Sequence, residues 1–152
     1  MDEQEILQRQ NRAEELFRQG FNCSQSVMAA CADIYGIDSS LALRLAASFG
    51  GGIGRMRQTC GAACGMFLLA GLHNGSTKPH DNEGKMNNYN TVQSLATAFK
   101  HEHGSLICAE LLGLAKPETS PEPESRTDAY YKKRPCVEMV RTAVGIYCKQ
   151  LL

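Results

Sequence analysis

The chain has 152 residues, and its 16 lysines and arginines balance its 16 aspartates and glutamates, so the formal net charge is zero. A chain of this length buries a real hydrophobic core, and we expect residues 1–152 to form a single domain. The balanced charge gives no electrostatic reason for binding to nucleic acid or to an acidic membrane surface, so neither is expected as a partner.

The role expected for the cysteines depends on whether the protein lies in a reducing or an oxidising compartment of the cell. The first fifteen residues are charged throughout, and no apolar run is long enough for a secretory signal or a transmembrane helix. We therefore expect a cytoplasmic protein that is not an integral membrane protein. Seven cysteines are present, and cysteine clusters in the cytosol are typically redox-active or metal-binding. No Cys-x-x-Cys motif occurs, so a thioredoxin-type dithiol is not expected.

The chain begins with a predicted helix over residues 2–19, which ends at Gly20. Here and in every later periodic stretch the apolar residues recur at helical spacing, whereas strand patterns never exceed a few residues. The apolar face of this first helix is thin for its length. We expect it to pack against a second copy as well as against its own core. A homodimer is therefore predicted, since closed two-fold pairs are the commonest assemblies.

Asn22 caps a second predicted helix, in which Gln25 completes a capping-box pattern, and this helix runs to about Tyr35. A third helix begins at Asp38 or Ser39, both of which are favourable N-cap residues. The side chains expected on its apolar face are Leu41, Leu45 and Phe49.

The segment from Phe49 to Leu72 is expected to be the centre of the fold. Its second half, from Cys60, has no charged residue, so a helix formed by it is apolar nearly all round and is buried on every side. Thr59 is its expected N-cap. Glycine inside a helix costs roughly 1 kcal/mol relative to alanine. The helix glycines therefore predict the close approach of another helix or of a bound group; they are Gly61, Gly65 and Gly71.

A glycine-rich loop precedes this central helix. It contains Gly52-x-Gly54 but lacks the third glycine and the preceding strand of a nucleotide-binding fingerprint. We keep the loop and the helix start as a candidate phosphate or cofactor site. The candidate cofactor-binding residues are Gly51, Gly52, Gly54, Arg55 and Gly61.

A polar loop over residues 73–85 leads to a fifth predicted helix over 86–103, which stops at Gly104. Ser105 caps a short helix that extends to Leu112. The apolar residues expected to pack along the fifth helix are Tyr89, Val92, Ala96 and Phe99.

Residues 116–128 are rich in proline, glutamate and serine and form the least structured stretch. The last helix begins at Pro135, which suits a first helical position, and runs to Leu151. The sequence as a whole predicts an all-α, single-domain bundle of six or seven helices around a buried central helix rich in glycine, alanine and cysteine.

Four of the seven cysteines fall in the first turn of a predicted helix, where unpaired N–H groups and the helix dipole favour an anion. A thiol there is expected to have a pKa below about 8.5, which favours both thiol exchange and metal ligation. Arg55, Arg57 and residues 132–134 add positive charge nearby. Helix starts can direct several side chains into one space, so we expect these four thiols to converge: Cys23, Cys60, Cys108 and Cys136.

The other three cysteines, Cys31, Cys64 and Cys148, are expected in helix interiors as small apolar core residues. Among the four that converge, Cys60 is the expected key thiol. A flexible glycine loop precedes it, and Gly61 leaves its flank open to a second sulfur.

Several motifs follow one another in an order that resembles a known family. They are FNCSQ at residues 21–25, FGGGIGR at 49–55, CGAACG at 60–65 and SLICAELLG at 105–113, followed by Cys136. From about Leu16 to Val144 the chain resembles the C_GCAxxG_C_C family of redox-active proteins, whose signature is a CGAxxG motif among four cysteines. The resemblance implies a redox role in which the family's four cysteines are Cys23, Cys60, Cys108 and Cys136.

Three functions are compatible with these patterns. The first is a thiol-based redox protein or oxidoreductase, in which the four cysteines exchange disulfides or electrons with a redox partner. In the second, the same four cysteines are metal ligands, because four thiolates are the usual complement of a tetrahedral zinc or an iron–sulfur cluster. The third is a non-catalytic binding or dimerisation module that uses the glycine-lined helix as an interface, and its thiols are unreactive.

Overall fold

The computed structural model describes residues 1–115 and 120–152, and all regular secondary structure in this part of the chain is helical. The predicted all-α fold is therefore confirmed. The described part has eight α-helices: α1 (Glu3–Arg18), α2 (Cys23–Cys31), α3 (Ser39–Ala46), α4 (Gly61–Asn74), α5 (Asn82–His103), α6 (Cys108–Leu111), α7 (Asp128–Lys133) and α8 (Cys136–Leu151). Two short 3₁₀ helices, Ala32–Tyr35 and Ala47–Phe49, follow α2 and α3.

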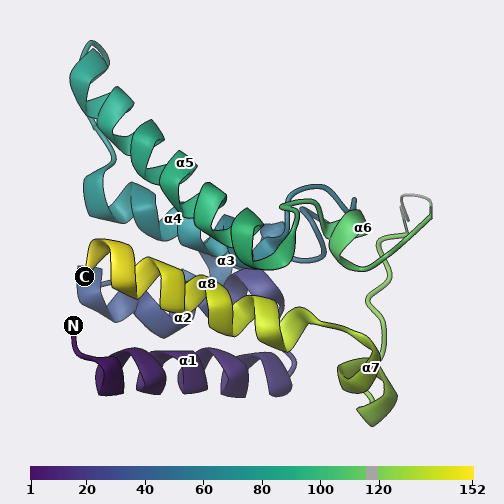
Figure 1. Ribbon diagram of the computed structural model, residues 1–152. Helices are drawn as coiled ribbons and strands as arrows, with labels where there is room; N and C mark the ends of the chain where they lie inside the picture. Colours follow the sequence, from purple (N-terminus) through teal and green to yellow (C-terminus); the bar gives the residue numbers. More distant parts are fainter. Residues whose placement is uncertain (116–119) are drawn as a thin grey trace.

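Helix α4 occupies the centre, with α2, α5 and α8 packed against it, while α1 covers α2 and α8 on the far side (Figure 1). Most residues of α4 from Gly61 to Ala70 are buried, as expected for a helix that is apolar nearly all round. The helices share one hydrophobic core. Its largest fully buried side chains include Phe17, Met66, Phe99 and Tyr147, from α1, α4, α5 and α8 respectively.

The chain direction gathers three helix starts at one end of the molecule. Helices α1 and α2 are joined by a short turn and run in opposite directions, and α4 and α5 form a second such hairpin (Figure 1). As a result, α2, α4 and α8 all begin at the end that carries α6 and α7 (Figure 1). This end is where the predicted cysteines lie.

Local capping residues determine several helix starts. Asp2 and Glu5 form a capping box at α1, and Asn22 and Gln25 form the predicted one at α2. Asp38 caps α3. Other predicted starts differ. Helix α4 has Cys60 as its N-cap in place of Thr59, and Pro135 is the N-cap of α8 and not its first residue. Helix α5 begins at Asn82, because Asp81 accepts a hydrogen bond from the Gly84 amide.

Two predicted apolar faces are wrong in part: Leu41 and Leu45 of α3 and Tyr89 of α5 are exposed, whereas Phe99 of α5 is buried as predicted. Leu41 and Leu45 are 42% and 46% exposed, because α3 turns Ala42 and Ala46 inward. These small side chains let the short helix lie close to α2. Tyr89 is 60% exposed, since the first turns of α5 contact α4 through amides: Asn88 Nδ2 donates to the Ala70 carbonyl at 3.2 Å.

The region after α5 also departs from the sequence prediction. The N-cap of α6 is Ile107, whereas Ser105 lies two residues earlier, where its hydroxyl accepts from the Ile107 amide. Helix α7 was missed, although Thr127 caps it by accepting from the Tyr130 amide. Of the stretch predicted to be least structured, residues 116–119 lie outside the described residues.

Within the described ranges, none of the helices combines the length and the apolar character needed to cross a membrane. Helix α1 buries Ile6, Ala13, Leu16 and Phe17 against α2 and α8 and leaves Leu7 49% exposed. The homodimer stays a prediction.

The packing of α4 on α2 requires glycine at one position of α4 and not at another. A Cβ on Gly65 would lie 2.7 Å from Val27 Cβ and 3.1 Å from the Ser24 carbonyl oxygen, whereas a Cβ on Gly71 would meet nothing within 4 Å. Overpacking typically costs about 1–3 kcal/mol. Alanine regains only about 1 kcal/mol of helix propensity.

We therefore expect Gly65→Ala to lower the free energy of unfolding by about 1–2 kcal/mol. The matched substitution Gly71→Ala should raise it by roughly 0.5–1 kcal/mol. Urea denaturation followed by circular dichroism measures both. Equal effects of the two substitutions would show that α2 and α4 are not in the close contact described here.

Candidate functional site

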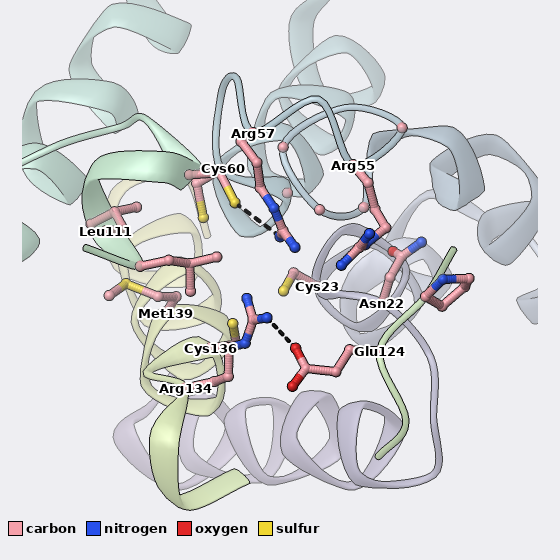
Figure 2. A pocket seen from close by; sticks show the side chains of 18 of the residues that line it. Asn22, Cys23, Arg55, Arg57, Cys60, Leu111, Glu124, Arg134, Cys136 and Met139 are labelled. Carbon is pink, nitrogen blue, oxygen red and sulfur yellow. Dashed lines mark hydrogen bonds and ion pairs between the residues drawn. The ribbon is translucent and has the colours of Figure 1, made fainter. Parts of the chain in front are cut away.

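The four predicted cysteines line a single cavity of about 400 Å³ at the end of the bundle where the helix starts gather. Cys23, Cys108 and Cys136 are the first residues of α2, α6 and α8, and Cys60 is the N-cap of α4. Figure 2 shows Cys23, Cys60 and Cys136 around the same space. The structure thus brings together, from four separate helices, the residues that the sequence selected.

A short antiparallel bridge holds two of these cysteines side by side. Thr59 and Ile107 pair as an isolated β-bridge, just before α4 and α6 respectively. The Cys60 amide donates to the Leu106 carbonyl at 2.7 Å, and the Cys108 amide donates to the Gln58 carbonyl at 2.6 Å. These backbone bonds fix the start of α6 against the start of α4.

Glycines allow the other elements to approach this bridge. A Cβ on Gly61 would lie 3.0 Å from the Phe49 carbonyl oxygen and 3.2 Å from Cys23 Cβ. A Cβ on Gly52 would lie 2.6 Å from Cys108 Cβ. Neither position has room for a larger residue without a shift of its neighbours. The expectation that Gly61 leaves space for a second cysteine agrees with this geometry.

The loop between α3 and α4 contains unusual backbone conformations next to the cavity. Ile53, Arg55 and Arg57 have φ values of 66°, 60° and 60°, in the left-handed region that side chains disfavour by roughly 1–2 kcal/mol each. Backbone hydrogen bonds hold the loop in this form; the Gln58 amide, for example, donates to the Gly52 carbonyl at 2.8 Å. Strain of this kind is concentrated at functional sites.

Arginines surround the thiols. Arg57 is 5% exposed, and its Nη1 donates to Cys108 Sγ at 3.7 Å. Arg134 pairs with Glu124 across the cavity wall (Figure 2). Arg126 is fixed by hydrogen bonds to the Phe17 and Phe21 carbonyls at 2.8 and 3.0 Å. The cavity is therefore a cationic environment, which stabilises a thiolate.

Cys136 is the thiol that this environment favours as an anion. The Cys23 thiol donates a hydrogen bond to the Cys136 sulfur, and this bond is the largest cause that lowers the pKa of Cys136 to about 7. The charges of Arg134 and Arg126 lower it further, against the opposing effect of burial. The same hydrogen bond raises the pKa of Cys23 well above its ordinary value. The pair therefore shares one proton near neutral pH, with the negative charge on Cys136.

The remaining two thiols contradict the expectation that every helix-start cysteine has a lowered pKa. Burial raises the pKa of Cys60 to about 12 and outweighs the amides of Ala62 and Ala63. Burial also raises the pKa of Cys108, although Arg57 acts in the opposite direction. The prediction of a lowered pKa is thus wrong for Cys60 and Cys108, because desolvation of a charge exceeds the effect of a helix start. It is also wrong for Cys23, chiefly because of its hydrogen bond with Cys136.

The cysteine arrangement does not fit a metal centre. Among residues 1–115 and 120–152, no three histidine, cysteine, aspartate or glutamate side chains are placed to hold a metal ion. Two of the thiols are engaged with each other, and a guanidinium lies against a third, Cys108.

The candidate cofactor residues also lie at the cavity. Arg55 Nη1 donates to the Ser120 carbonyl at 2.7 Å, so this side chain ties the glycine loop to the segment before α7. Binding of a phosphate or cofactor by these residues stays a prediction. Those that line the cavity are Gly51, Gly52, Gly54, Arg55 and Gly61.

Sequence reasoning did not select several further residues of the cavity wall. Glu124 and Arg126 come from the stretch predicted to be least structured, and Tyr130 comes from the missed helix α7. Thr127 and Asp128, a typical helix start, were the signal that could have revealed α7 and its contacts with the site.

A comparison with family models finds one that covers most of the chain. The model described as "Putative redox-active protein (C_GCAxxG_C_C)" matches residues 21–149. This range includes all four cysteines of the cavity. Searches of the curated proteins and of the solved structures found no match.

The shared proton of the Cys23–Cys136 pair gives a prediction about pH. Alkylation of Cys136 by iodoacetamide should increase as the pH rises through about 7 and then level off, because only the thiolate reacts. Alkylation of Cys60 should still be increasing above pH 9, since its pKa is about 12. Peptide mass spectrometry after timed labelling measures each site separately.

Two substitutions of Cys23 separate the hydrogen bond from the bulk of the side chain. Cys23→Ala removes the donor, so the pKa of Cys136 should rise toward its ordinary value. Cys23→Ser retains a hydroxyl donor and should preserve much of the lowering. If the Cys136 profile is the same in both variants and in the original protein, the hydrogen bond does not control its pKa.

Proposed function

The chain belongs to the C_GCAxxG_C_C family, and we propose that it is a cytoplasmic thiol oxidoreductase in which Cys136 and Cys23 exchange with a small disulfide substrate. One observation carries the proposal: a thiol with a pKa of about 7 lies beside a protonated thiol in a cavity. A thiol whose pKa is near the ambient pH is close to the optimum for attack on disulfides. The family description as redox-active supports the same reading.

In the first step the Cys136 thiolate attacks one sulfur of the substrate disulfide. A bond forms between Cys136 Sγ and that sulfur while the S–S bond of the substrate breaks. The other substrate sulfur leaves as a thiolate and takes a proton from solvent. The product is a mixed disulfide on Cys136.

In the second step Cys23 resolves the mixed disulfide. Its sulfur loses its proton to solvent and attacks Cys136 Sγ, and the remaining substrate sulfur leaves as a thiolate, which then takes up a proton. The substrate has gained two electrons and two protons and becomes two thiols, and the protein holds a Cys23–Cys136 disulfide. A second thiol compound of the cytoplasm returns the pair to the reduced state by the reverse exchange.

We assign Cys60 and Cys108 to a second dithiol in the same cavity. Both thiols are protonated at neutral pH because burial raises their pKa. They are therefore slow to attack an external disulfide, whereas exchange with an oxidised Cys23–Cys136 pair is an intramolecular reaction. In this role Cys60 stores electrons and does not make the first attack, which differs from the sequence expectation that it is the key thiol.

The exposure of the four cysteines supports the different roles assigned to the two pairs. Cys23 and Cys136 are partly exposed, whereas Cys60 and Cys108 are 6% and 8% exposed. A cavity of about 400 Å³ accommodates a compact disulfide compound. The accessible pair thus meets the substrate, and the deeper pair lies behind it.

A chromogenic aryl disulfide tests the first step by release of its coloured thiol. Cys136→Ser should slow the fast phase of release by roughly 100-fold, because the other thiolates are scarce at neutral pH and only partly compensate through higher nucleophilicity. Cys23→Ser should retain a fast release of one coloured thiol and leave the aryl adduct on Cys136, since no thiol resolves it promptly. Stopped-flow absorbance and intact-protein mass spectrometry measure both outcomes.

Cys64→Ser is the matched control. Cys64 is buried and does not line the cavity, and its thiol donates to the Thr59 carbonyl at 3.8 Å, so its replacement should leave the fast phase unchanged. A slow, uniform reaction of all thiols in the unsubstituted protein would refute the proposal and favour the non-catalytic binding module.

A further inference from the structure

Two more cysteines, Cys31 and Cys148, lie near the C-terminal ends of α2 and α8, the helices that begin with Cys23 and Cys136. Cys31 ends α2 and Cys148 lies in the last turn of α8, and they are 0% and 1% exposed. Neither lines the cavity of the candidate site. Along their helices, at roughly 1.5 Å per residue, they are about 12 Å and 18 Å from Cys23 and Cys136.

The parallel course of the two helices explains why a second pair exists. Helices α2 and α8 pack against each other and begin at the same end of the molecule (Figure 1). Because they run in the same direction, Cys23 and Cys136 lie at their starts, and Cys31 and Cys148 both lie in their later turns. One helix pair therefore carries two thiol pairs.

The two thiols of the second pair act on each other. A side-chain hydrogen bond between them is the largest cause that lowers the pKa of Cys148 and raises that of Cys31. Arg9 lies nearby, where its guanidinium donates to the Ala30 carbonyl at 2.9 Å and pairs with Asp33, and its charge also lowers the pKa of Cys148. The arrangement repeats the chemistry of the Cys23–Cys136 pair inside the core.

Burial as a small apolar residue is the ordinary role of a cysteine in a core. That role explains why each thiol is buried, but it does not require two thiols from different helices to lie in hydrogen-bond contact beside a guanidinium. Cys64 provides the contrast: it is buried at 6% exposure in α4, and its thiol donates to a backbone carbonyl.

We propose that Cys31 and Cys148 are a second, buried redox site, which closes to a disulfide when hydrogen peroxide or a small hydroperoxide oxidises the protein. This site is separate from the exchange cavity and does not depend on the function proposed for it. The disulfide changes the stability of the helical bundle, because it joins the end of α2 covalently to the last turn of α8.

The oxidation proceeds in two balanced steps. The Cys148 thiolate attacks one peroxide oxygen, so that an S–O bond forms, the O–O bond breaks and the other oxygen leaves as hydroxide, which takes the proton released by the thiol. Cys31 then attacks Cys148 Sγ, so that an S–S bond forms, the S–O bond breaks and hydroxide leaves with the Cys31 proton as water. Two thiols lose two electrons, and one hydrogen peroxide becomes two waters.

The test uses the full chain treated with hydrogen peroxide, alkylated under denaturing conditions and digested without reduction. Mass spectrometry should find a peptide pair joined through Cys31 and Cys148, and Tm should rise by roughly 5–15 °C because the bridge closes a very long loop. In Cys31→Ser no resolving thiol remains, so dimedone should trap a sulfenic acid at Cys148. Cys64→Ser is the control and should retain the bridge.

The double variant Cys23→Ser/Cys136→Ser distinguishes this site from the exchange cavity. Loss of the fast disulfide exchange with retention of the Cys31–Cys148 bridge is the expected result, and the bridge should form even if the proposed function is wrong. Recovery of Cys31 and Cys148 as alkylated thiols, after peroxide has oxidised the other cysteines of the unsubstituted chain, would overturn the proposal. This outcome is measured on the unsubstituted chain, so it does not depend on whether a variant folds.

Discussion

The close approach of α2 to α4 is the contact on which the rest of the site depends. Gly61 and Gly65 face α2 without side chains, and a Cβ at either position would press on backbone or Cβ atoms of α2 or of the residues just before the loop. This contact brings the start of α2, with Cys23, to the start of α4, with Cys60. It also explains why the central helix accepts glycines that weaken it as an isolated helix.

Once the four helix starts meet, electrostatics decides which thiol ionises. A cavity lined by four thiols cannot hold several thiolates, because each charge raises the pKa of its neighbours and desolvation disfavours every anion there. The hydrogen bond from Cys23 and the nearby arginines favour a single anion, at Cys136. The helix dipole, which is common to all four positions, does not distinguish them. The nearest hydrogen-bond donor and the degree of burial distinguish them.

The sequence predicted what local interactions determine. The capping box at Asn22 and the charge-free run of α4 are local signals, and the helices they predict are present. Leu41 and Leu45 were assigned to the wrong face because apolar spacing does not show that the alanines of a short helix make the closer contact. The order of the thiol pKa values and the Cys31–Cys148 contact depend on which helices run parallel, and no local pattern contains that information.

The central claim is that Cys23 and Cys136 form the redox couple of the cavity, and a redox titration tests it most directly. The protein is equilibrated in buffers of reduced and oxidised glutathione, quenched with acid, alkylated and mapped by mass spectrometry without reduction. We expect a two-electron transition in which the peptide joined through Cys23 and Cys136 appears before any other cross-link of the cavity. A first bridge between Cys60 and Cys108, or free thiols at Cys23 and Cys136 throughout the transition, would contradict it.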